Sequence, residues 1–459
     1  MMIVDRLREI VGTNWVTTEE ERIVDYLTDE TAPGIKPQPA TEVVLVKPAD
    51  AQEISRILKL ANDERIPVFP RGGGTGLCGG AIPTQDGIIL SLERLKAVDV
   101  DNDNLMAVVE AGATLGELQS RVEEEGLFFP PHPGDESAQV GGLVACNAGG
   151  ARAVKYGVMR NYVRGLEVVM PTGEVLNIGG KLIKDNTGYS LMHLLIGSEG
   201  TLGVITKAVL RLFPRPPASA TMIVPFHDRR DAIRTVPRIL QSGIIPLAIE
   251  YMDRAAAEAS AESLSMDWPS KVGSAFLMII VEGSSEEEML SACARFSDIC
   301  QQCNGLEPVV GESRKKQADI LKIRSNVYLA AKPYIADALD IAVPPASMAA
   351  LMDAIDTIAQ RFGTAIPMLG HAGDGNLHPA LLMDLVEGDG SKLRQAKRAI
   401  YEEALKLGGT MTAEHGLGKV RPPDLDIFLD QKRIDLMRGI KQVFDPNGIL
   451  NPGCVLALE

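Results

Sequence analysis

Hydrophobic and polar positions near the start of the chain predict a helix between two short strands. Apolar side chains over residues 54–61 recur with the period of an amphipathic helix. Asp50 and Glu53 form the pattern that caps such a helix at its amino end. β-branched runs at 42–47 and 67–70 have the length of strands. Together these elements indicate a βαβ-like unit.

Between residues 71 and 213, short strands are separated by glycine-rich loops. Apolar runs predict strands at 87–92, 97–101, 107–111, 163–170, 174–178 and 202–213. The sequence Pro171-Thr172-Gly173 is typical of a hairpin turn, and Thr114 is expected to cap a helix that runs to Glu125. This part of the chain therefore predicts sheets with few helices.

Beyond three prolines at 214–217, strands alternate with longer helices. Strands are expected at 220–225, 247–252 and 274–281, and helices at 228–241, 284–302, 314–330, 347–363, 391–407 and 431–444. This texture predicts a sheet covered by helices. We therefore expect an α+β protein with a helical segment at 1–37, which a capping-box pattern at 18–21 indicates, a first domain at 38–216 and a second at 217–459.

Composition and charge narrow the class of protein. The 459 residues are 45% hydrophobic and 23% charged, as in a soluble globular protein. The net charge of −15, with no basic run, argues against nucleic-acid binding and means that an anionic substrate needs a local positive site. No apolar run approaches the roughly 18 residues of a membrane span. The charged first ten residues do not resemble a signal peptide, and six cysteines form no disulfide framework, so we expect a cytoplasmic protein.

Many of the 44 glycines gather in three clusters. The first, Pro-Arg-Gly-Gly-Gly-Thr-Gly at 70–76, satisfies G-x-G-x-x-G with the residues that follow, but it does not open a helix as a dinucleotide fingerprint must. Its consecutive N–H groups suit an anion such as a pyrophosphate, and a flexible surface turn is the alternative. Two further clusters, at 131–150 and 197–206, are rich in small residues that allow a ring system to approach the backbone.

In their order along the chain, these motifs resemble the vanillyl-alcohol-oxidase family of FAD proteins, in particular its branch of glycolate oxidase catalytic subunits and FAD-dependent D-lactate dehydrogenases. The resemblance runs from about residue 38 to 455. It implies a PCMH-type FAD-binding domain of two α+β subdomains, followed by an α/β cap domain. The cap is expected to hold an antiparallel sheet covered by helices, and a C-terminal helical segment that returns to the flavin.

The resemblance also implies which residues bind FAD. These are Arg71, Gly72, Gly73, Gly74, Thr75, Gly76, Gly79, Pro133, Gly134, Ser137, Gly141, Gly142, Asn147, Gly150, Glu199, Gly203, Ile205 and Asn451. Members that attach flavin covalently through the first loop carry a histidine there. Thr75 stands at that place in this sequence, so noncovalent FAD is expected.

Three of the six histidines fall in two glycine-flanked motifs near the end of the chain. His371 and His378 bracket Ala-Gly-Asp-Gly-Asn-Leu, whose glycines exclude a regular helix, and Glu414 and His415 lie in Ala-Glu-His-Gly. Two imidazoles and a carboxylate are ligands for Zn²⁺, Fe²⁺ or Mn²⁺, whereas each histidine alone suits a structural role. The resemblance implies that His371, His378 and Glu414 hold the metal. It makes His415 the base that takes the substrate hydroxyl proton while a hydride passes to the flavin.

A substrate carboxylate requires a positive partner. Arg324 matches a carboxylate-binding arginine of the family, although a solvated helix charge is the alternative, and Tyr328 lies one turn later. Relatives that oxidise 2-hydroxyglutarate carry a lysine near this region. Residues 336–339 contain none, which favours a short monoacid.

We therefore expect an FAD-dependent dehydrogenase or oxidase that converts a short (R)-2-hydroxy acid, D-lactate or glycolate, into the 2-oxo acid. The chain carries no second cofactor motif, so electrons are expected to pass to an iron–sulfur subunit, an electron-transfer flavoprotein, a cytochrome or a quinone. Attachment to the inner membrane through that partner and a homodimer are further expectations. The alternatives are a metallohydrolase, a noncatalytic flavin-binding subunit of a glycolate oxidase-type complex, and a D-2-hydroxyglutarate-type dehydrogenase.

Overall fold

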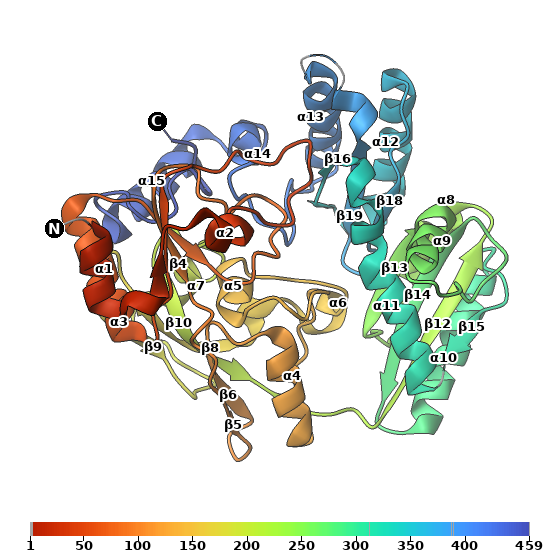
Figure 1. Cartoon of the computed structure of the whole chain (residues 1–459). Helices are drawn as coiled ribbons and strands as arrows, with labels where there is room; N and C mark the ends of the chain where they lie inside the picture. Colours follow the sequence, from red (N-terminus) through yellow and green to blue (C-terminus); the bar gives the residue numbers. More distant parts are fainter. Residues whose placement is uncertain (1–2, 312, 387, 389, 459) are drawn as a thin grey trace.

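The computed structural model describes residues 3–311, 313–386, 388 and 390–458, and its chain forms two domains that lie side by side (Figure 1). The first domain contains a four-stranded and a five-stranded sheet, and the second contains an eight-stranded sheet. Helices accompany each sheet, so the expected α+β class is confirmed.

The four-stranded sheet has the order β1-β2-β4-β3, formed by Val16–Thr17, Val43–Val46, Gly87–Ser91 and Val68–Arg71. β2, β4 and β3 are parallel, and α3 (Ala51–Glu64) is the crossover between β2 and β3. The predicted cap of α3 is confirmed, because Asp50 accepts a hydrogen bond from the Glu53 N–H at 2.8 Å.

The capping box predicted at 18–21 does not form. α2 (Glu20–Ile23) is a single turn without a side-chain cap, and the Glu19 N–H donates to Thr17 instead. A single 3-10 turn, Val24–Tyr26, follows α2. The Arg71 guanidinium donates to the carbonyl oxygens of Asp25, Tyr26 and Thr28 and so holds this segment in place.

The five-stranded sheet is antiparallel, with the order β5-β6-β10-β8-β9, formed by Val98–Asp101, Met106–Glu110, Val204–Arg211, Val163–Val169 and Val175–Gly179. β8 and β9 form the predicted hairpin. α4 (Leu115–Glu124) begins with a capping box of Thr114 and Glu117, as the sequence predicts. With α5 (Val140–Ala145), α4 buries the apolar face of this sheet.

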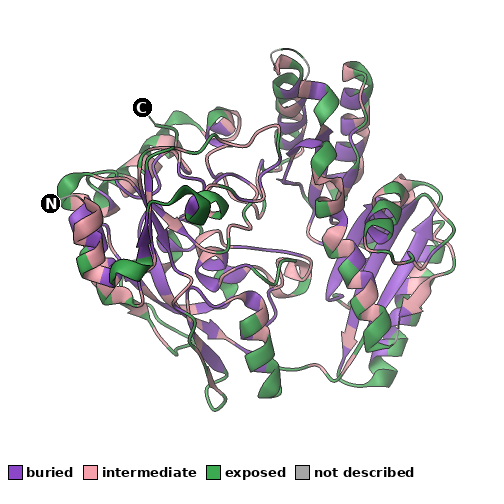
Figure 2. Cartoon of the chain, in the orientation of Figure 1, coloured by how far each residue is buried: buried purple, intermediate pink, exposed green. Residues whose placement is uncertain are grey.

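The second domain is built on the antiparallel order β15-β12-β14-β13-β18-β19-β16, with β17 paired to β19. In that order the strands are Val309–Gly311, Ala218–Phe226, Ala275–Gly283, Ala248–Asp253, Met368–His371, Asn376–Leu382 and Ile335–Ala338, and β17 is Ile341–Ala342. Figure 2 shows this sheet as buried strands between helices with exposed outer faces.

Helices cover both faces of this sheet. α8 (Arg229–Leu240), α10 (Glu286–Gln301), α12 (Met348–Phe362) and α13 (Ser391–Lys406) share one apolar core. α9 (Arg254–Ser263) and α11 (Arg314–Ala331) pack over the other face. The expected antiparallel sheet covered by helices is therefore present.

The end of the chain returns to the first domain. After α14 (Leu425–Phe428) and α15 (Gln431–Phe444), the Asn451 N–H donates to the Val68 carbonyl at 2.8 Å, and the Val68 N–H donates to Ile449. Residues 449–451 thus lie beside β3.

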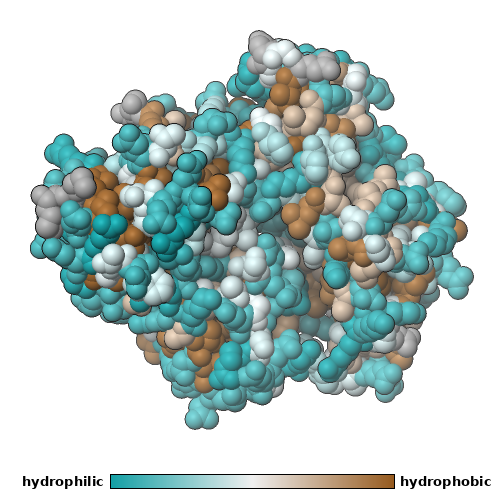
Figure 3. All heavy atoms as spheres, viewed as in Figure 1, coloured by the Kyte–Doolittle hydropathy of each residue, from teal (hydrophilic) through white to brown (hydrophobic). Residues whose placement is uncertain are grey.

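Hydrophilic residues cover most of the face seen in Figure 3, and hydrophobic residues are scattered among them. Among the described residues, no helix combines the length and the apolarity that crossing a membrane requires.

Candidate active site

A cavity with an empty volume of about 1320 Å³, its open mouth included, lies where the three glycine clusters meet. Most residues expected to bind FAD line it: Arg71, Gly72, Gly73, Gly74, Thr75, Gly76, Pro133, Gly141, Gly142, Glu199, Gly203, Ile205 and Asn451. Glu414 and His415 of the second domain line it too. One space therefore joins the glycine loops to the histidine–glutamate motif.

The remaining residues expected at the cofactor do not line the cavity: Gly79, Gly134, Ser137, Asn147 and Gly150. They shape the loops around it. The Gly79 N–H donates to Thr31, and Asn147 accepts a hydrogen bond from the Arg160 N–H. Gly150 has a φ of +109°, and an added Cβ would lie 2.3 Å from the His132 carbonyl oxygen. Only glycine fits at that position.

The cavity wall has the character expected of a cofactor site. A Cβ added to Gly76 or Gly142 would meet no atom within 4 Å, so both glycines open onto empty space. The Gln139 side-chain oxygen in this wall is buried without a hydrogen-bond partner among the described residues, and is available to a donor on a ligand. A wall made largely of glycine backbone suits the pyrophosphate and the flat ring system of a dinucleotide such as FAD.

Arg71 lies in the wall, but its guanidinium is bound to the amino-terminal segment. The three carbonyl oxygens of the amino-terminal segment use its donors, and burial lowers the pKa of Arg71. The sequence motif identified the right loop, but the Arg71 side chain holds the segment 25–28 in place.

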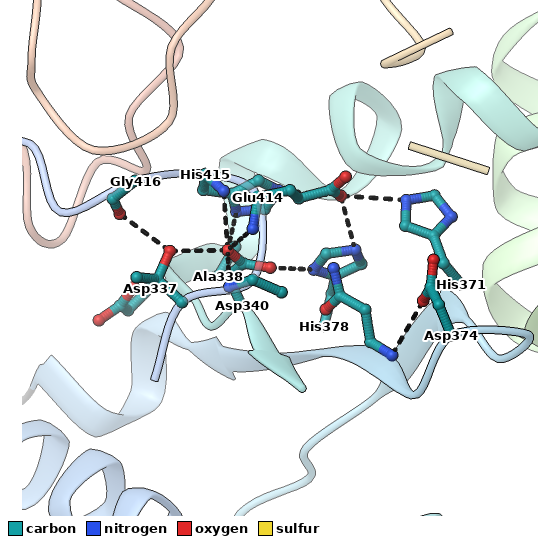
Figure 4. A network of polar contacts seen from close by, with 12 residues as sticks. Asp337, Ala338, Asp340, His371, Asp374, His378, Glu414, His415 and Gly416 are labelled. Atoms are coloured by element: carbon teal, nitrogen blue, oxygen red, sulfur yellow. Dashed lines mark hydrogen bonds and ion pairs between the residues drawn. The ribbon is translucent and has the colours of Figure 1, made fainter. Parts of the chain in front are cut away.

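His371 and His378 stand on the hairpin of β18 and β19, and both face the Glu414 carboxylate (Figure 4). Glu414 Oε1 lies 3.0 Å from His371 Nε2 and 3.5 Å from His378 Nε2. The tight turn depends on Gly375, whose φ is +85° and whose added Cβ would lie 2.0 Å from the Val343 carbonyl oxygen. The structure thus brings together the three predicted metal ligands.

Two carboxylates that the sequence analysis did not identify lie behind these histidines. Glu250, in the middle of β13 and fully buried, is 2.7 Å from His371 Nδ1. Asp340 Oδ1 lies 3.7 Å from His378 Nδ1 and has no other partner among the described residues. Each imidazole therefore has a carboxylate at Nδ1 and Glu414 at Nε2. This arrangement is typical of metal-binding histidines and their supporting carboxylates.

The charges in the cluster shift one another's protonation. Burial alone would lower the pKa of His371, but Glu250 and Glu414 raise it well above its ordinary value. Burial would raise the pKa of Glu414, but His371, His378 and His415 hold it well below its ordinary value. His371 and Arg324 likewise lower the pKa of Glu250 against the effect of burial, so the cluster favours the ionised form of Glu250 and of Glu414.

His415 is positioned at the seam between the cluster and the cavity. Its ring stacks on His378 with the centroids 4.9 Å apart, and its Nε2 lies 3.7 Å from Glu414 Oε1. Burial lowers the pKa of His415, which favours the neutral imidazole that a general base requires.

Ligand atoms of Asp340, His378, Glu414 and His415 all lie within 4.8 Å of one another, close enough to share a metal ion. This group shares His378 and Glu414 with the predicted set. Asp340 Oδ2, however, already accepts hydrogen bonds from Thr412 and from the N–H groups of 413–415, so this oxygen mainly supports the main chain. The residues present have the chemistry of a divalent metal site with open positions.

The structure separates Arg324 from Tyr328. Arg324, on α11, pairs with Glu250 at 2.6 Å and thereby joins the histidine cluster, and its Nε is buried without a hydrogen-bond partner in the described part of the chain. The Tyr328 hydroxyl donates to the Glu30 carbonyl at 2.7 Å. Tyr328 therefore ties α11 to the amino-terminal segment, and its hydroxyl does not reach the cluster.

The chain is similar over most of its length to known flavoproteins. It is 42% identical to the D-lactate dehydrogenase of Archaeoglobus fulgidus, over 94% of this chain and 95% of that protein. It is 35% identical to a glycolate oxidase subunit of Bacillus subtilis, over 90% and 89%, and 30% identical to the D-2-hydroxyglutarate dehydrogenase of Stutzerimonas stutzeri, over 99% of each.

Solved structures and family models agree with the fold. The structure of p-cresol methylhydroxylase with substrate superposes with a TM-score of 0.78 at 18% identity, over 99% of this chain and 96% of that one, which confirms the expected PCMH-type fold. The FAD binding domain model matches residues 43–179, and the model of the C-terminal domain of FAD linked oxidases matches residues 215–455. With a cavity that suits FAD and these matches over most of its length, the chain belongs to the family of FAD-linked oxidases and is an FAD-dependent oxidoreductase.

Proposed function

We propose that this protein oxidises a short (R)-2-hydroxy acid, D-lactate or glycolate, to the 2-oxo acid. The observation that carries the proposal is that the glycine loops and the histidine–glutamate cluster border the same cavity. Residues of the cofactor cavity and of the histidine–glutamate cluster line one cavity, with His415 at the junction. The names of three relatives, which act on D-lactate, glycolate and D-2-hydroxyglutarate, support the same substrate class.

His415 is the proposed base. A bound flavin would supply the acceptor for a hydride from C2 of the substrate, and the proton of the substrate hydroxyl would then need a base from this chain. The buried imidazole, with its pKa lowered, holds the position from which it takes that proton. Asp340 fixes the His415 main chain through an N–H bond of 2.8 Å.

His371, His378 and Glu414 are the proposed ligands of a divalent metal, Zn²⁺, Fe²⁺ or Mn²⁺, supported by Glu250 and Asp340 behind the imidazoles. When bound, such a metal lowers the pKa of an oxygen that it contacts. Arg324 is proposed to orient the substrate carboxylate, since its buried Nε has no hydrogen-bond partner among the described residues while its Nη2 pairs with Glu250.

A monoacid is preferred over a diacid in this proposal. Residues 336–339 carry no lysine, and their one charged member, Asp337, forms two buried hydrogen bonds with Arg421, of 2.6 and 2.7 Å. This corner of the second domain offers no spare positive charge for a second carboxylate.

Electrons are proposed to leave the flavin for a partner, an iron–sulfur subunit, an electron-transfer flavoprotein, a cytochrome or a quinone. The sequence carries no second cofactor motif. One relative is named as a subunit of glycolate oxidase, which supports a multi-subunit setting.

The test is anaerobic reduction of the purified, FAD-loaded protein by D-lactate, L-lactate, glycolate or D-2-hydroxyglutarate. Loss of the flavin absorbance measures the reduction. D-lactate or glycolate should bleach the flavin. His415→Asn should slow bleaching by about 10²–10⁴-fold with FAD still bound, because general-base catalysis contributes on that order.

His193→Asn is the matched control, because His193 is exposed and its ring contacts only Ser190 among the described residues. It should reduce at the wild-type rate. Bleaching of His415→Asn at the wild-type rate would contradict the proposed base. A wild-type protein that no 2-hydroxy acid bleaches would instead favour the noncatalytic flavin-binding subunit.

A further inference from the structure

Glu199 belongs to the first domain, yet its carboxylate binds a loop of the second. Its Oε1 accepts a hydrogen bond from the Leu417 N–H and its Oε2 one from the Gly418 N–H, both at 2.8 Å. The family resemblance assigns Glu199 to the cofactor, and its residue does line the cavity. Both side-chain oxygens are nevertheless committed to the loop 412–419, which carries Glu414 and His415.

The loop is shaped to receive this carboxylate. Gly416 has a φ of +80°, and an added Cβ would lie 2.8 Å from the Glu199 carboxylate carbon. Gly418 has a φ of +53°, and an added Cβ would lie 1.9 Å from the Cys78 carbonyl oxygen. Successive N–H groups in such a turn form a concave anion site. Glycine is required at both positions for the two domains to approach this closely.

The conformation of Glu199 itself is unusual. Its φ is +51°, in the left-handed region that residues other than glycine, asparagine and aspartate rarely adopt. Such conformations persist where the surrounding contacts determine them. The Asn451 side chain supplies one of these contacts, because its amide donates to the Glu199 carbonyl at 2.9 Å.

A second carboxylate, that of Asp340 in the second domain, binds the amino-terminal part of the loop 412–419. Asp340 Oδ2 accepts hydrogen bonds from the N–H groups of Ala413, Glu414 and His415 at 2.8–2.9 Å. His415 therefore lies between two carboxylates that bind its loop, Asp340 from its own domain and Glu199 from the flavin-binding domain. The position of its imidazole relative to the cavity depends on both.

We propose that Glu199 is a positioning residue that fixes the loop 412–419, and through it His415, against the cofactor cavity. Because Glu199 belongs to the first domain, the position of His415 then depends on how the two domains are placed relative to each other. The catalytic consequence rests on the proposed function, in which His415 takes the substrate proton.

The test compares two carboxylate-to-amide variants of the FAD-loaded protein. Glu199→Gln keeps the acceptor for Leu417 but can turn an amide donor toward the Gly418 N–H. At saturating D-lactate or glycolate, flavin reduction should slow by about 10- to 100-fold, because displacing a reacting group slightly costs up to about that factor. The FAD content and the substrate concentration for half-maximal reduction should stay within about threefold of wild type.

Glu282→Gln is the matched control. Glu282 also joins the two domains, since it accepts a hydrogen bond from Tyr156 at 2.5 Å and forms an ion pair with Lys155 at 2.6 Å, and neither interaction involves the loop 412–419. This variant should reduce at the wild-type rate. Wild-type reduction in Glu199→Gln would overturn the proposal, and so would equal slowing in Glu282→Gln, because the effect would then come from domain packing in general.

A second variant acts from the loop side in case Glu199→Gln does not retain FAD. Gly416→Ala leaves the cavity wall unchanged but pushes a methyl group against the Glu199 carboxylate. Slow reduction with FAD bound supports the proposal, and a wild-type rate overturns it.

Amide hydrogen exchange tests the binding of the loop by Glu199 without any substrate. Leu417 and Gly418 should exchange faster in Glu199→Gln than in wild type, and unchanged exchange overturns this role of Glu199. If no 2-hydroxy acid reduces the wild-type flavin, the proposed function fails, while the exchange result still decides the role of Glu199.

Discussion

The two domains contribute different kinds of residues to the wall of the cavity. The side from the first domain is mostly glycine and other small residues, so its surface is largely backbone. The side from the second domain is formed largely by Glu414 and His415, which belong to a cluster of buried charges in which Glu250 contacts both Arg324 and His371. The glycine side determines the shape of the cavity. The charged side determines which of its imidazoles and carboxylates carry a proton. Added volume should therefore damage one side, and a removed charge should damage the other.

The largest effect is expected from filling the backbone-built side. Gly142→Leu places a side chain in space that no described atom occupies, so the variant should fold but lose FAD and, with it, all activity. The measurement is the flavin absorbance of the purified variant, with circular dichroism as the check of folding.

Gly439→Leu makes the same change on the exposed surface of α15, where an added Cβ also meets nothing. It should keep its flavin. A Gly142→Leu protein with a full complement of FAD would show that the glycine wall is not the cofactor site.

Removing a charge from the other side should lower stability. Glu250→Gln leaves Arg324 without its ion-pair partner and His371 without the carboxylate at its Nδ1, and should reduce the free energy of unfolding by about 3–5 kcal/mol. Denaturant unfolding measures the loss.

The double variant Glu250→Gln with Arg324→Met sharpens this prediction. It removes the unpaired charge, so it should regain part of the lost stability without regaining activity. Equal stability of the single and double variants would show that the buried pair is not the source of the effect.

Metal removal should distinguish the role of the charged side from that of the glycine side without a mutation. Dialysis against a chelator should slow flavin reduction by about 100-fold, because a bound metal contributes several kcal/mol to such a step. FAD should stay bound, since none of the proposed metal ligands belongs to the glycine wall except Glu414 at its edge. Zn²⁺ or Mn²⁺ should restore the rate, and an unchanged rate after chelation would contradict the metal site.

The smallest effect concerns Lys419, which joins the two sides. Its ammonium donates to the carbonyls of Gly80 and Ile82 and to Asn451, and burial lowers its pKa to about 8. The unfolded chain, with an ordinary lysine pKa, binds more protons than the folded protein between about pH 8 and 10.5.

Stability of the wild type relative to Lys419→Met should therefore rise with pH across this window, by about 2 kcal/mol. Unfolding at pH 7.5 and pH 10 measures the change. A difference that stays constant or falls would mean that Lys419 keeps an ordinary or raised pKa.

Much of the fold could be predicted from local pattern. The cap at Asp50, the hairpin of β8 and β9, and α15 with its bounds at Gln431 and Phe444 all follow from residues close together in the sequence. The histidine and glycine clusters could be identified for the same reason, because each forms a short continuous motif.

The supporting carboxylates could not be found in that way. Glu250 is a single acid within an apolar strand, and its partners, Arg324 and His371, lie far along the chain. The one local signal is that a glutamate inside such a strand is rarely buried unless it is paired. The direction of the Arg71 side chain was hidden as well, since it depends on carbonyls of a segment that only the fold brings near.

The return of the chain to β3 has a consequence for the order of events during synthesis. Glycine-rich segments before residue 205 make most of the cavity wall, but Glu414, His415 and Asn451 complete it. About 250 further residues must be translated between these points, which takes roughly 12–50 s at common elongation rates. The first domain can fold in that interval, yet FAD meets its finished site only after residue 451 has been translated.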